Sequence, residues 1–344
     1  MKTKRFLLAV TFGLALALTL SCTSGGDDDH SGSSSSVNKS SSSSGSEESF
    51  TFTMENYPRV DGSTSTNPLN SIIAAKLLDL EYEWQPVPDL NQGSKDVFFK
   101  DTMLSPDFRQ KIKCSQTHGA IVNLIDNKTD LIIVARTMSK DEKQHADSIG
   151  ISLTETPIAL DGLDFIINSR NLVSSLLVEQ VQNIYLGNIT NWAEVGGANF
   201  EIIPYIRNAN SGSQEMMNEI VMKNTGMPNW DWWLSEEDVR IGGMIHVYEA
   251  LMRNPDRGIC FTPHYYKEYM VGDFMASGMI KTLDINGITP NKNTIKNKSY
   301  PFVANVYVSI RSDLDKNSSA YKLYQWLQTN SGKLVIEESG YVPN

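Results

Sequence analysis

The sequence lacks the short motifs on which many hydrolases depend. It contains no Gly-x-Ser-x-Gly elbow, no His-Glu-x-x-His, no Walker loop and no Cys-x-x-Cys pair. Its 5 histidines are scattered, and the spacing of His264 and Glu268 is more typical of a helix surface than of a metal site. We therefore expect a protein that is not an enzyme, with no cofactor and no metal.

Positive charge is also scarce. The chain has 30 Lys and Arg against 40 Asp and Glu, which gives a formal net charge of -10. Because binding to duplex nucleic acid requires clustered Lys and Arg, we expect no nucleic-acid partner. A small anionic ligand is not excluded, since a few aimed dipoles and one or two cations hold a buried anion whatever the charge of the distant surface.

An apolar run at the N-terminus is too short to be a comfortable membrane span. Three basic residues precede this run at 6–20, and Ser21-Cys22 follows it. The pattern is typical of a lipoprotein signal peptide over residues 1–21, with Cys22 as the lipidated first residue of the mature chain. Thr19 stands where leucine is usual, so a plain signal peptide cut nearby stays open as the alternative.

Apolar residues are nearly absent from residues 22–49, where Ser, Gly, Asp and Glu predominate. Such a segment cannot offset the entropy of ordering, so we expect a disordered tether.

Cysteine is rare as well, since only Cys114 and Cys260 follow Cys22. Residues 259–261 are expected to form a core strand, in which a free cysteine behaves as a small hydrophobe. A disulfide between Cys114 and Cys260 stays open as an alternative.

Short apolar runs alternate with amphipathic stretches along the rest of the chain. This alternation favours an α/β fold with mainly parallel sheets. Hydrophobic residues make up 40% of the chain, enough for two cores of ordinary domain size. Helices are expected at 71–80, 178–185, 213–222 and 320–328, and strands at 130–134, 165–168, 202–206 and 302–310.

The stretch 202–217 directs a cation, two hydroxyls and a run of backbone amides toward one place. An apolar run leads to Arg207, and Ser211-Gly212-Ser213 then opens a helical pattern. The first amides of a helix have no intrahelical partner and carry partial positive charge, so they favour an oxyanion. The guanidinium matches two oxygens of a phosphate or carboxylate. An ordinary N-cap beside a solvated arginine is the alternative.

This motif resembles the third ligand loop of phosphate-binding proteins, the extracytoplasmic receptors of phosphate ABC transporters, in which Arg-x-x-x-Ser-Gly-Thr precedes a helix. Other segments across residues 57–344 are similar to that family in the same order. They are 61–69, like its first Gly-Ser-Thr loop; 130–136, like its strand that leads to a Ser-Arg pair; 159–168, like its interdomain crossing; and 184–192, 283–290 and 300–302.

The resemblance implies the α/β fold of the two-lobed, type II periplasmic-binding-protein class, with two crossing strands and the ligand in the cleft between the lobes. Lobe 1 is then discontinuous, at 50–161 and 300–344, and lobe 2 is the inserted stretch 162–299. We expect the first crossing at 160–163, the return near Tyr300, and a monomer.

The resemblance also implies a set of ligand residues. The second loop is the weakest match, because Cys114 to Gly119 stands where the family usually has Gly-Ser-Gly or Gly-Ser-Ser. Some members carry an aspartate that accepts a hydrogen bond from protonated phosphate and rejects fully ionised sulfate, and Asp61 and Asp161 are the candidates for this acceptor here. The implied phosphate-binding residues are Ser63, Thr64, Ser65, Thr117, Arg136, Arg207, Ser211, Gly212 and Ser213.

The implied function is a lipid-anchored extracytoplasmic receptor on a bacterial membrane. It would close on inorganic phosphate, or a similar tetrahedral oxyanion, and deliver it to the transmembrane subunits of an ABC permease. One alternative is a surface sensor or adhesin that binds oxyanions or phosphorylated ligands without a transporter. The other is an enzyme such as a phosphatase, which would need a nucleophile with its base or a metal cluster.

Overall fold

The computed structural model describes residues 50–344 except 88–92, 224, 227–239, 273–274 and 276. Phe50 to Asn344 forms one compact unit. The predicted signal peptide, the predicted tether and Cys22 lie outside the described residues. Within the described ranges, no helix has the length and apolar character needed to cross a membrane.

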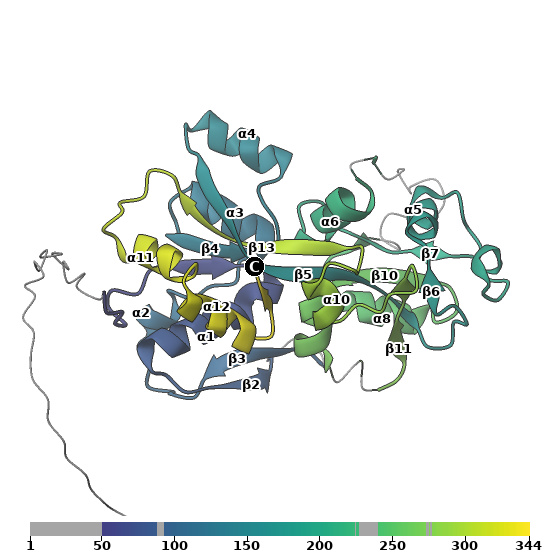
Figure 1. Ribbon diagram of the computed structural model, residues 1–344, viewed down its shortest axis with the longest axis horizontal. Helices are drawn as coiled ribbons and strands as arrows, with labels where there is room; N and C mark the ends of the chain where they lie inside the picture. The colour runs from purple at the N-terminus through teal and green to yellow at the C-terminus, as the bar shows by residue number, and fades with distance from the viewer. Residues whose placement is uncertain (1–49, 88–92, 224, 227–239, 273–274, 276) are drawn as a thin grey trace, which may run out of the picture. The chain divides into compact units, whose positions relative to one another are not determined.

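The 16-residue strand β5 (Leu153–Asn168) runs through two regions of β-sheet (Figure 1). Its first part, up to Gly162, pairs with β13 (Val303–Arg311), and from Leu163 onward it pairs with β10 (Gly258–Pro263). We call the first sheet the first part of β5 together with β1 (Val60–Gly62), β4 (Leu131–Val134), β13 and β14 (Val342–Pro343). We call the second sheet the second part of β5 together with β7 (Ile203–Pro204), β10 and β11 (Ile280–Thr282).

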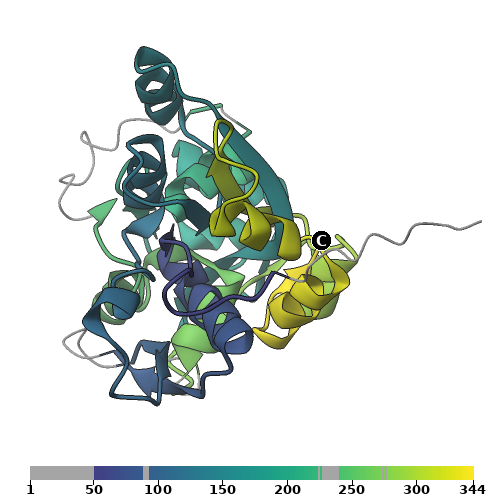
Figure 2. The ribbon, with the colours of Figure 1, turned by 90° about the vertical axis from the view of Figure 1, so that its left-hand side faces the viewer.

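Strand β4 supports two separate cores of the first sheet. Leu131 and Ile133 belong to the cluster that includes α1 (Asn67–Leu78), whereas Ile132 and Val134 pack with α3 (Gln116–Ile125). Successive side chains of a strand point to opposite faces, so a continuous apolar run suits a strand that is covered on both sides. On the α1 side, α12 (Asn330–Glu338) lies beside α1 (Figure 1, Figure 2).

Aromatic side chains form the core of the second sheet. Phe165 of β5 contacts Tyr185 of α5 (Val178–Leu186), Phe261 of β10 and Phe302, with ring centroids between 5.6 and 6.3 Å apart. Phe302 immediately precedes β13. Its contact with Phe165 therefore anchors the beginning of β13 in the core of the second sheet. Rings of this size contribute most of the burial energy of a core.

The predicted α/β class is confirmed, but the prediction of mainly parallel sheets is wrong. β1 pairs parallel with β4 and β7 with β10, whereas β5 pairs antiparallel with β10, β11, β13 and β14. The reason is topological. β5 leads out of the first sheet into the second and β13 leads back, so the two strands run in opposite directions where they pair.

Several predicted elements form with shifted ends. The strand expected at 202–206 is divided into β7 and β8 (Ile206–Arg207), and the helix expected at 213–222 is α6 (Gly212–Met216) continued by the π-helical turn η3 (Met217–Val221). Cys114 and Cys260 are free, and Cys260 is buried in β10. The remaining elements are η1 (Thr64–Thr66), β2 (Tyr82–Pro86), β3 (Lys95–Phe99), α2 (Pro106–Arg109), α4 (Lys140–Ser148), β6 (Ser175–Leu176), η2 (Trp192–Val195), β9 (Arg240–Ile241), α8 (His246–Arg253), η5 (Tyr266–Met270), β12 (Asp284–Ile285), α10 (Lys292–Lys296) and α11 (Ser319–Trp326).

Candidate functional site

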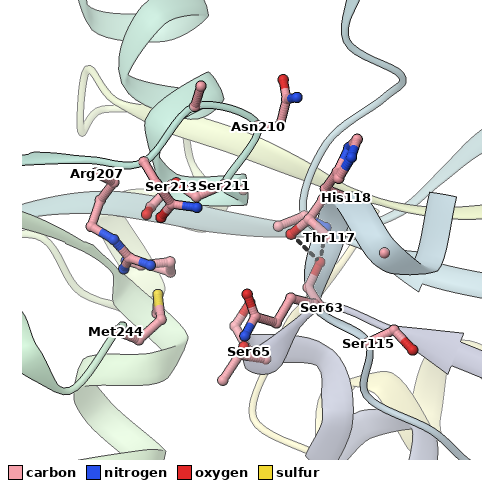
Figure 3. A pocket seen from close by; sticks show the side chains of 18 residues that line it. Ser63, Ser65, Ser115, Thr117, His118, Arg207, Asn210, Ser211, Ser213 and Met244 are labelled. Carbon is pink, nitrogen blue, oxygen red and sulfur yellow. Dashed lines mark hydrogen bonds between the residues drawn. The ribbon is translucent and has the colours of Figure 1, made fainter. Parts of the chain in front are cut away.

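Three loops enclose a cavity of about 420 Å³ (Figure 3). The first loop follows β1, the second precedes α3, and the third follows β8. All the predicted phosphate-binding residues except Arg136 line this cavity. The lining residues are Ser63, Thr64, Ser65, Ser115, Gln116, Thr117, His118, Gly119, Ala135, Arg207, Asn208, Ala209, Asn210, Ser211, Gly212, Ser213, Met244 and Pro263.

The first loop is held tightly against β4. A Cβ atom on Gly62 would lie 2.7 Å from the carbonyl oxygen of Ile133, so only glycine fits at this position. The Ser63 hydroxyl oxygen accepts a hydrogen bond from the Ala135 amide at 3.1 Å and lies 2.8 Å from Thr117 Oγ1. The 3-10 turn η1 then leads into α1, which places the first amides of a helical segment at the cavity.

The second loop keeps a backbone shape that favours glycine without having glycine there. Gln116, at the start of α3, has a φ of 62°, in the left-handed region. Asp61 fixes this loop from behind, because its Oδ1 accepts hydrogen bonds from the Gly62 and Ser115 amides at 2.8 Å each, and its Oδ2 from Asn123 Nδ2 at 2.9 Å.

The position of Asp61 argues against its predicted role as acceptor of a ligand proton. The side chain is fully buried and does not line the cavity. Its two oxygens are occupied by donors of the protein itself, which hold the first and second loops together. Asp61 is therefore a positioning residue for the loops.

Arg207 brings a buried cation to the cavity. The residue is 5% exposed, and its Nε and Nη2 donate to the carbonyl oxygens of Ile241 at 2.8 Å and Gly242 at 3.2 Å. Burial lowers the pKa of the guanidinium to about 10, so it stays protonated at neutral pH. Among the residues with described positions, no carboxylate pairs with it. A buried cation in this state favours a ligand that supplies the negative charge.

The serines on either side of Gly212 differ in their contacts. Ser211 Oγ accepts a hydrogen bond from the Gln214 amide at 3.1 Å, so Ser211 is the N-cap of α6. Ser213 Oγ is buried and has no hydrogen-bond partner in the described part of the chain. A Cβ atom on Gly212 would lie 2.5 Å from Thr117 Oγ1, so the second and third loops touch here. Ser213 thus keeps a hydroxyl without a described protein partner, whereas the Ser211 hydroxyl caps the helix.

Arg136 lies outside the cavity lining and is engaged elsewhere. Its Nη1 and Nη2 donate to both carboxylate oxygens of Glu142 at 2.7 and 2.9 Å, and both side chains are buried. Nη2 also donates to the carbonyl oxygen of Asn210 at 2.9 Å, and Asn210 Nδ2 donates to Asp141 Oδ2 at 2.6 Å. This geometry argues against the predicted contact with phosphate, because Glu142 already neutralises the charge of Arg136. The side chain of Arg136 instead ties α4 to the third loop.

Asp161 lies where β5 passes from the first sheet to the second. Its Oδ1 accepts hydrogen bonds from the amides of Gly162 at 2.8 Å and Tyr265 at 3.0 Å, whereas its Oδ2 is buried without a partner among the described residues. Burial raises the pKa of the carboxyl to about 6. Asp161 lines a separate cavity of about 20 Å³, so this candidate acceptor is also away from the three loops.

Two asparagines of the third loop were missing from the predicted site. Asn208 lines the cavity with a buried Oδ1 that has no partner in the described part of the chain, and Asn210 has a φ of 63° and contacts Arg136. The repeated asparagine in Asn208-Ala209-Asn210 is a signal that was available, because asparagine tolerates left-handed turns.

The arrangement is suited to binding an anion. The cavity combines a guanidinium that has no carboxylate partner among the described residues, hydroxyl groups from the first, second and third loops, and the amides at the start of two helical segments. Within the described ranges, no three His, Cys, Asp or Glu side chains are grouped so that they could hold a metal ion.

Comparisons with known proteins bear on the family and the fold. A family model described as a PBP superfamily domain matches residues 96–330. The chain is 21% identical over 225 residues to the phosphate-binding protein PstS of Borreliella burgdorferi, which covers 64% of this chain and 75% of that protein. It is 24% identical over 231 residues to PstS of Staphylococcus saprophyticus, which covers 66% of each chain.

Two solved structures show the same fold. One, assigned as a phosphate ABC transporter substrate-binding protein of Clostridium perfringens and solved with bound phosphate, has a TM-score of 0.58 at 20% identity and covers 84% of this chain and 100% of that one. The other, an ABC-type phosphate transport receptor of Vibrio cholerae, has a TM-score of 0.54 at 20% identity and covers 82% of this chain and 98% of that one. The predicted two-lobed fold is therefore confirmed.

Proposed function

The chain belongs to the PBP superfamily, and from this premise we propose that it is an extracytoplasmic receptor that binds inorganic phosphate and delivers it to an ABC permease. The observation that carries the proposal is the state of Arg207. This arginine is buried, lines the cavity and has no carboxylate partner among the described residues. A phosphate dianion would supply negative charge to Arg207 and offer acceptor oxygens to the donors that line the cavity.

We propose that two lobes close on phosphate by a hinge motion. One lobe comprises residues 50–161 and 300–344, and the other comprises residues 162–299. Two observations support this proposal. The cavity receives its first two loops from the first sheet and its third loop from the other side of the point where β5 changes partners. β5 and β13 are also the strands that connect the two sheets. Ligand contacts made on both sides would then favour the closed state.

The location follows from the N-terminal sequence. We propose that lipid on Cys22 anchors the receptor to a bacterial membrane, with residues 22–49 as the tether and no enzymatic role for the protein. Cys22→Ser should abolish fatty-acid labelling and release the protein from the membrane fraction. Persistent labelling of the variant would exclude Cys22 as the site of the lipid.

Calorimetric titration with phosphate tests the function. Arg207→Ala should lose about 2 to 5 kcal/mol of binding free energy, as expected when one partner of a desolvated charge pair is removed. Arg170→Ala is the matched control, because Arg170 is an exposed arginine that pairs with Asp256 and does not line the cavity. Equal phosphate affinity in the wild type and Arg207→Ala would refute the proposed site.

A further inference from the structure

Two hydrogen bonds join the third loop to the segment that follows β4. Arg136 Nη2 donates to the main-chain oxygen of Asn210 at 2.9 Å, and Asn210 Nδ2 donates to Asp141 Oδ2 at 2.6 Å. Arg136 and Asp141 belong to the proposed lobe 1, whereas Asn210, which follows β8, belongs to the proposed lobe 2. A single residue of lobe 2 therefore offers an acceptor to a cation of lobe 1 and a donor to an anion of lobe 1.

The half of this contact that lies in lobe 1 is held in place by lobe 1 itself. Both oxygens of Glu142 accept hydrogen bonds from Arg136, and Arg136 Nη1 also donates to the main-chain oxygen of Thr137 at 2.8 Å. Glu142 Oε2 accepts a further hydrogen bond from the Ser139 amide at 2.7 Å. Because Glu142 balances the charge of Arg136, separation from Asn210 would expose one donor to water and would not leave an isolated charge.

The half that lies in lobe 2 is a short turn beside the ligand donors. The Ser211 amide donates to the main-chain oxygen of Asn208 at 3.2 Å, and Asn210 has a φ of 63°, which asparagine tolerates better than most residues. Figure 3 shows the Asn210 amide turned away from Ser63. Since Ser211 is the N-cap of α6, a displacement of this turn also displaces the donors of the third loop.

We propose that Asn210 is a latch between the lobes, whose two hydrogen bonds form when the lobes close on phosphate and slow the release of the anion. This inference rests on the proposed function, because it requires an anion on which the lobes close. It makes Arg136 a positioning residue that receives the third loop. Water can replace both hydrogen bonds when the lobes part, so the latch favours the closed state without preventing opening.

The test is the rate at which the full-length protein releases radiolabelled phosphate into an excess of unlabelled phosphate. Asn210→Gly removes the side-chain hydrogen bond and tolerates the left-handed backbone. Asp141→Ala removes the same hydrogen bond at a residue that does not line the cavity. Each variant should release phosphate about 3 to 30 times faster than the wild type, as expected for one hydrogen bond to a charged group near the surface. The association rate should change far less, because the latch forms after the anion is bound.

Each variant has a matched control. Asn127→Gly replaces an exposed asparagine that has a φ of 58°, and Asp107→Ala removes an exposed aspartate from the first turn of α2. Neither residue lines the cavity, so both controls should release phosphate at the wild-type rate. In urea denaturation without phosphate, each latch variant should lose no more stability than its control, because the latch acts in the closed state. A contact with a purely structural role would instead stabilise the ligand-free protein.

The double variant tests whether Asn210 and Asp141 act through one hydrogen bond. If they do, Asn210→Gly combined with Asp141→Ala should release phosphate no faster than the faster single variant. Three results would each overturn the inference and leave the phosphate receptor intact: release rates equal to those of the controls, single effects that multiply in the double variant, or a loss of ligand-free stability beyond that of the controls. A wild type that does not bind phosphate would overturn the proposed function, and this inference with it.

Discussion

Arg136 and Arg207 are buried to nearly the same degree, 2% and 5% exposed, but their surroundings differ. Both oxygens of Glu142 neutralise Arg136, whereas Arg207 contacts two main-chain carbonyl oxygens and has no described carboxylate partner. Burial of a charge is tolerated when an opposite charge accompanies it. The protein supplies that charge to Arg136, and we propose that a ligand supplies it to Arg207.

Two carboxylates at the connection between the sheets repeat this contrast. Burial by itself would raise the pKa of Asp164, but Lys267 at 2.7 Å and His264 at 2.8 Å hold it below the usual range. Asp161 forms no such ion pair with the residues that the structure describes, and burial raises its pKa to about 6. A buried charge with an ionic partner and one without a described partner thus occur both among the arginines near the loops and among the carboxylates at the connection between the sheets, and substitutions can separate their roles.

The largest effect is expected at the pair that the protein completes itself. Glu142→Ala leaves the Arg136 charge buried without its partner, so the free energy of unfolding should fall by about 3 to 5 kcal/mol. Urea denaturation measures this loss. The control is Glu179→Ala, an exposed glutamate in α5, which should change stability by about 0.5 kcal/mol or less. A loss no greater than that of the control would contradict a structural role for Arg136.

A smaller effect, dependent on pH, is expected at Asp161. Its pKa is about 6 in the folded protein against an ordinary value of 3.8, so the folded state holds a proton that the unfolded state releases. This contribution to stability is present below pH 3.8 and is lost as the pH rises toward 6. Asparagine cannot ionise. The stability of Asp161→Asn relative to wild type should therefore rise over this window, by up to about 3 kcal/mol.

Urea denaturation at several pH values checks this prediction. For Asp164→Asn, the change of stability with pH relative to wild type should have the opposite sign. Because Lys267 and His264 hold the pKa of Asp164 down, its ionised form stabilises the folded state at higher pH. Asp164→Asn should therefore lose stability relative to wild type as the pH rises through the acidic range. Parallel pH profiles of the two variants would show that the paired and unpaired carboxylates do not differ.

The smallest effect is expected where the second and third loops touch. Gly212→Ala adds a Cβ atom 2.5 Å from Thr117 Oγ1, so the Thr117 side chain must shift to accommodate it. Phosphate binding should weaken by about 1 to 2 kcal/mol, measured by calorimetry. Gly272→Ala is the control, because a Cβ atom there meets nothing within 4 Å. Undiminished affinity in Gly212→Ala would mean that close contact of these loops is not needed for binding.

The sequence placed Arg207 at the cavity because the strand, turn and helix that carry it there are adjacent in the chain, although its side-chain partners Ile241 and Gly242 are distant. An arginine at the end of an apolar run, followed by Ser211-Gly212-Ser213, specifies a strand, a turn and a helix within a few residues. Arg136 has the same local appearance. Glu142 lies only six residues further along the chain, in the first turn of α4, so its pairing with Arg136 depends on the conformation of the short turn between them, which the sequence pattern did not indicate.

The fold shows the same limit. Alternation of apolar and amphipathic stretches predicted the α/β class and the positions of α1 and α5. The 16-residue extent of β5 was missed, because its beginning carries Thr154, Glu155 and Thr156 and lacks the apolar run that marks its end. Its antiparallel partners come from distant parts of the chain, and pairing over such distances leaves no local signal.

A crystal structure of the protein with bound phosphate tests the contrast between the two arginines most directly. Phosphate oxygens should lie about 3 Å from the Arg207 guanidinium and from Ser213 Oγ, while Arg136 keeps both hydrogen bonds to Glu142. Phosphate held by Arg136, with the Glu142 pair broken and Arg207 without a ligand contact, would contradict the account.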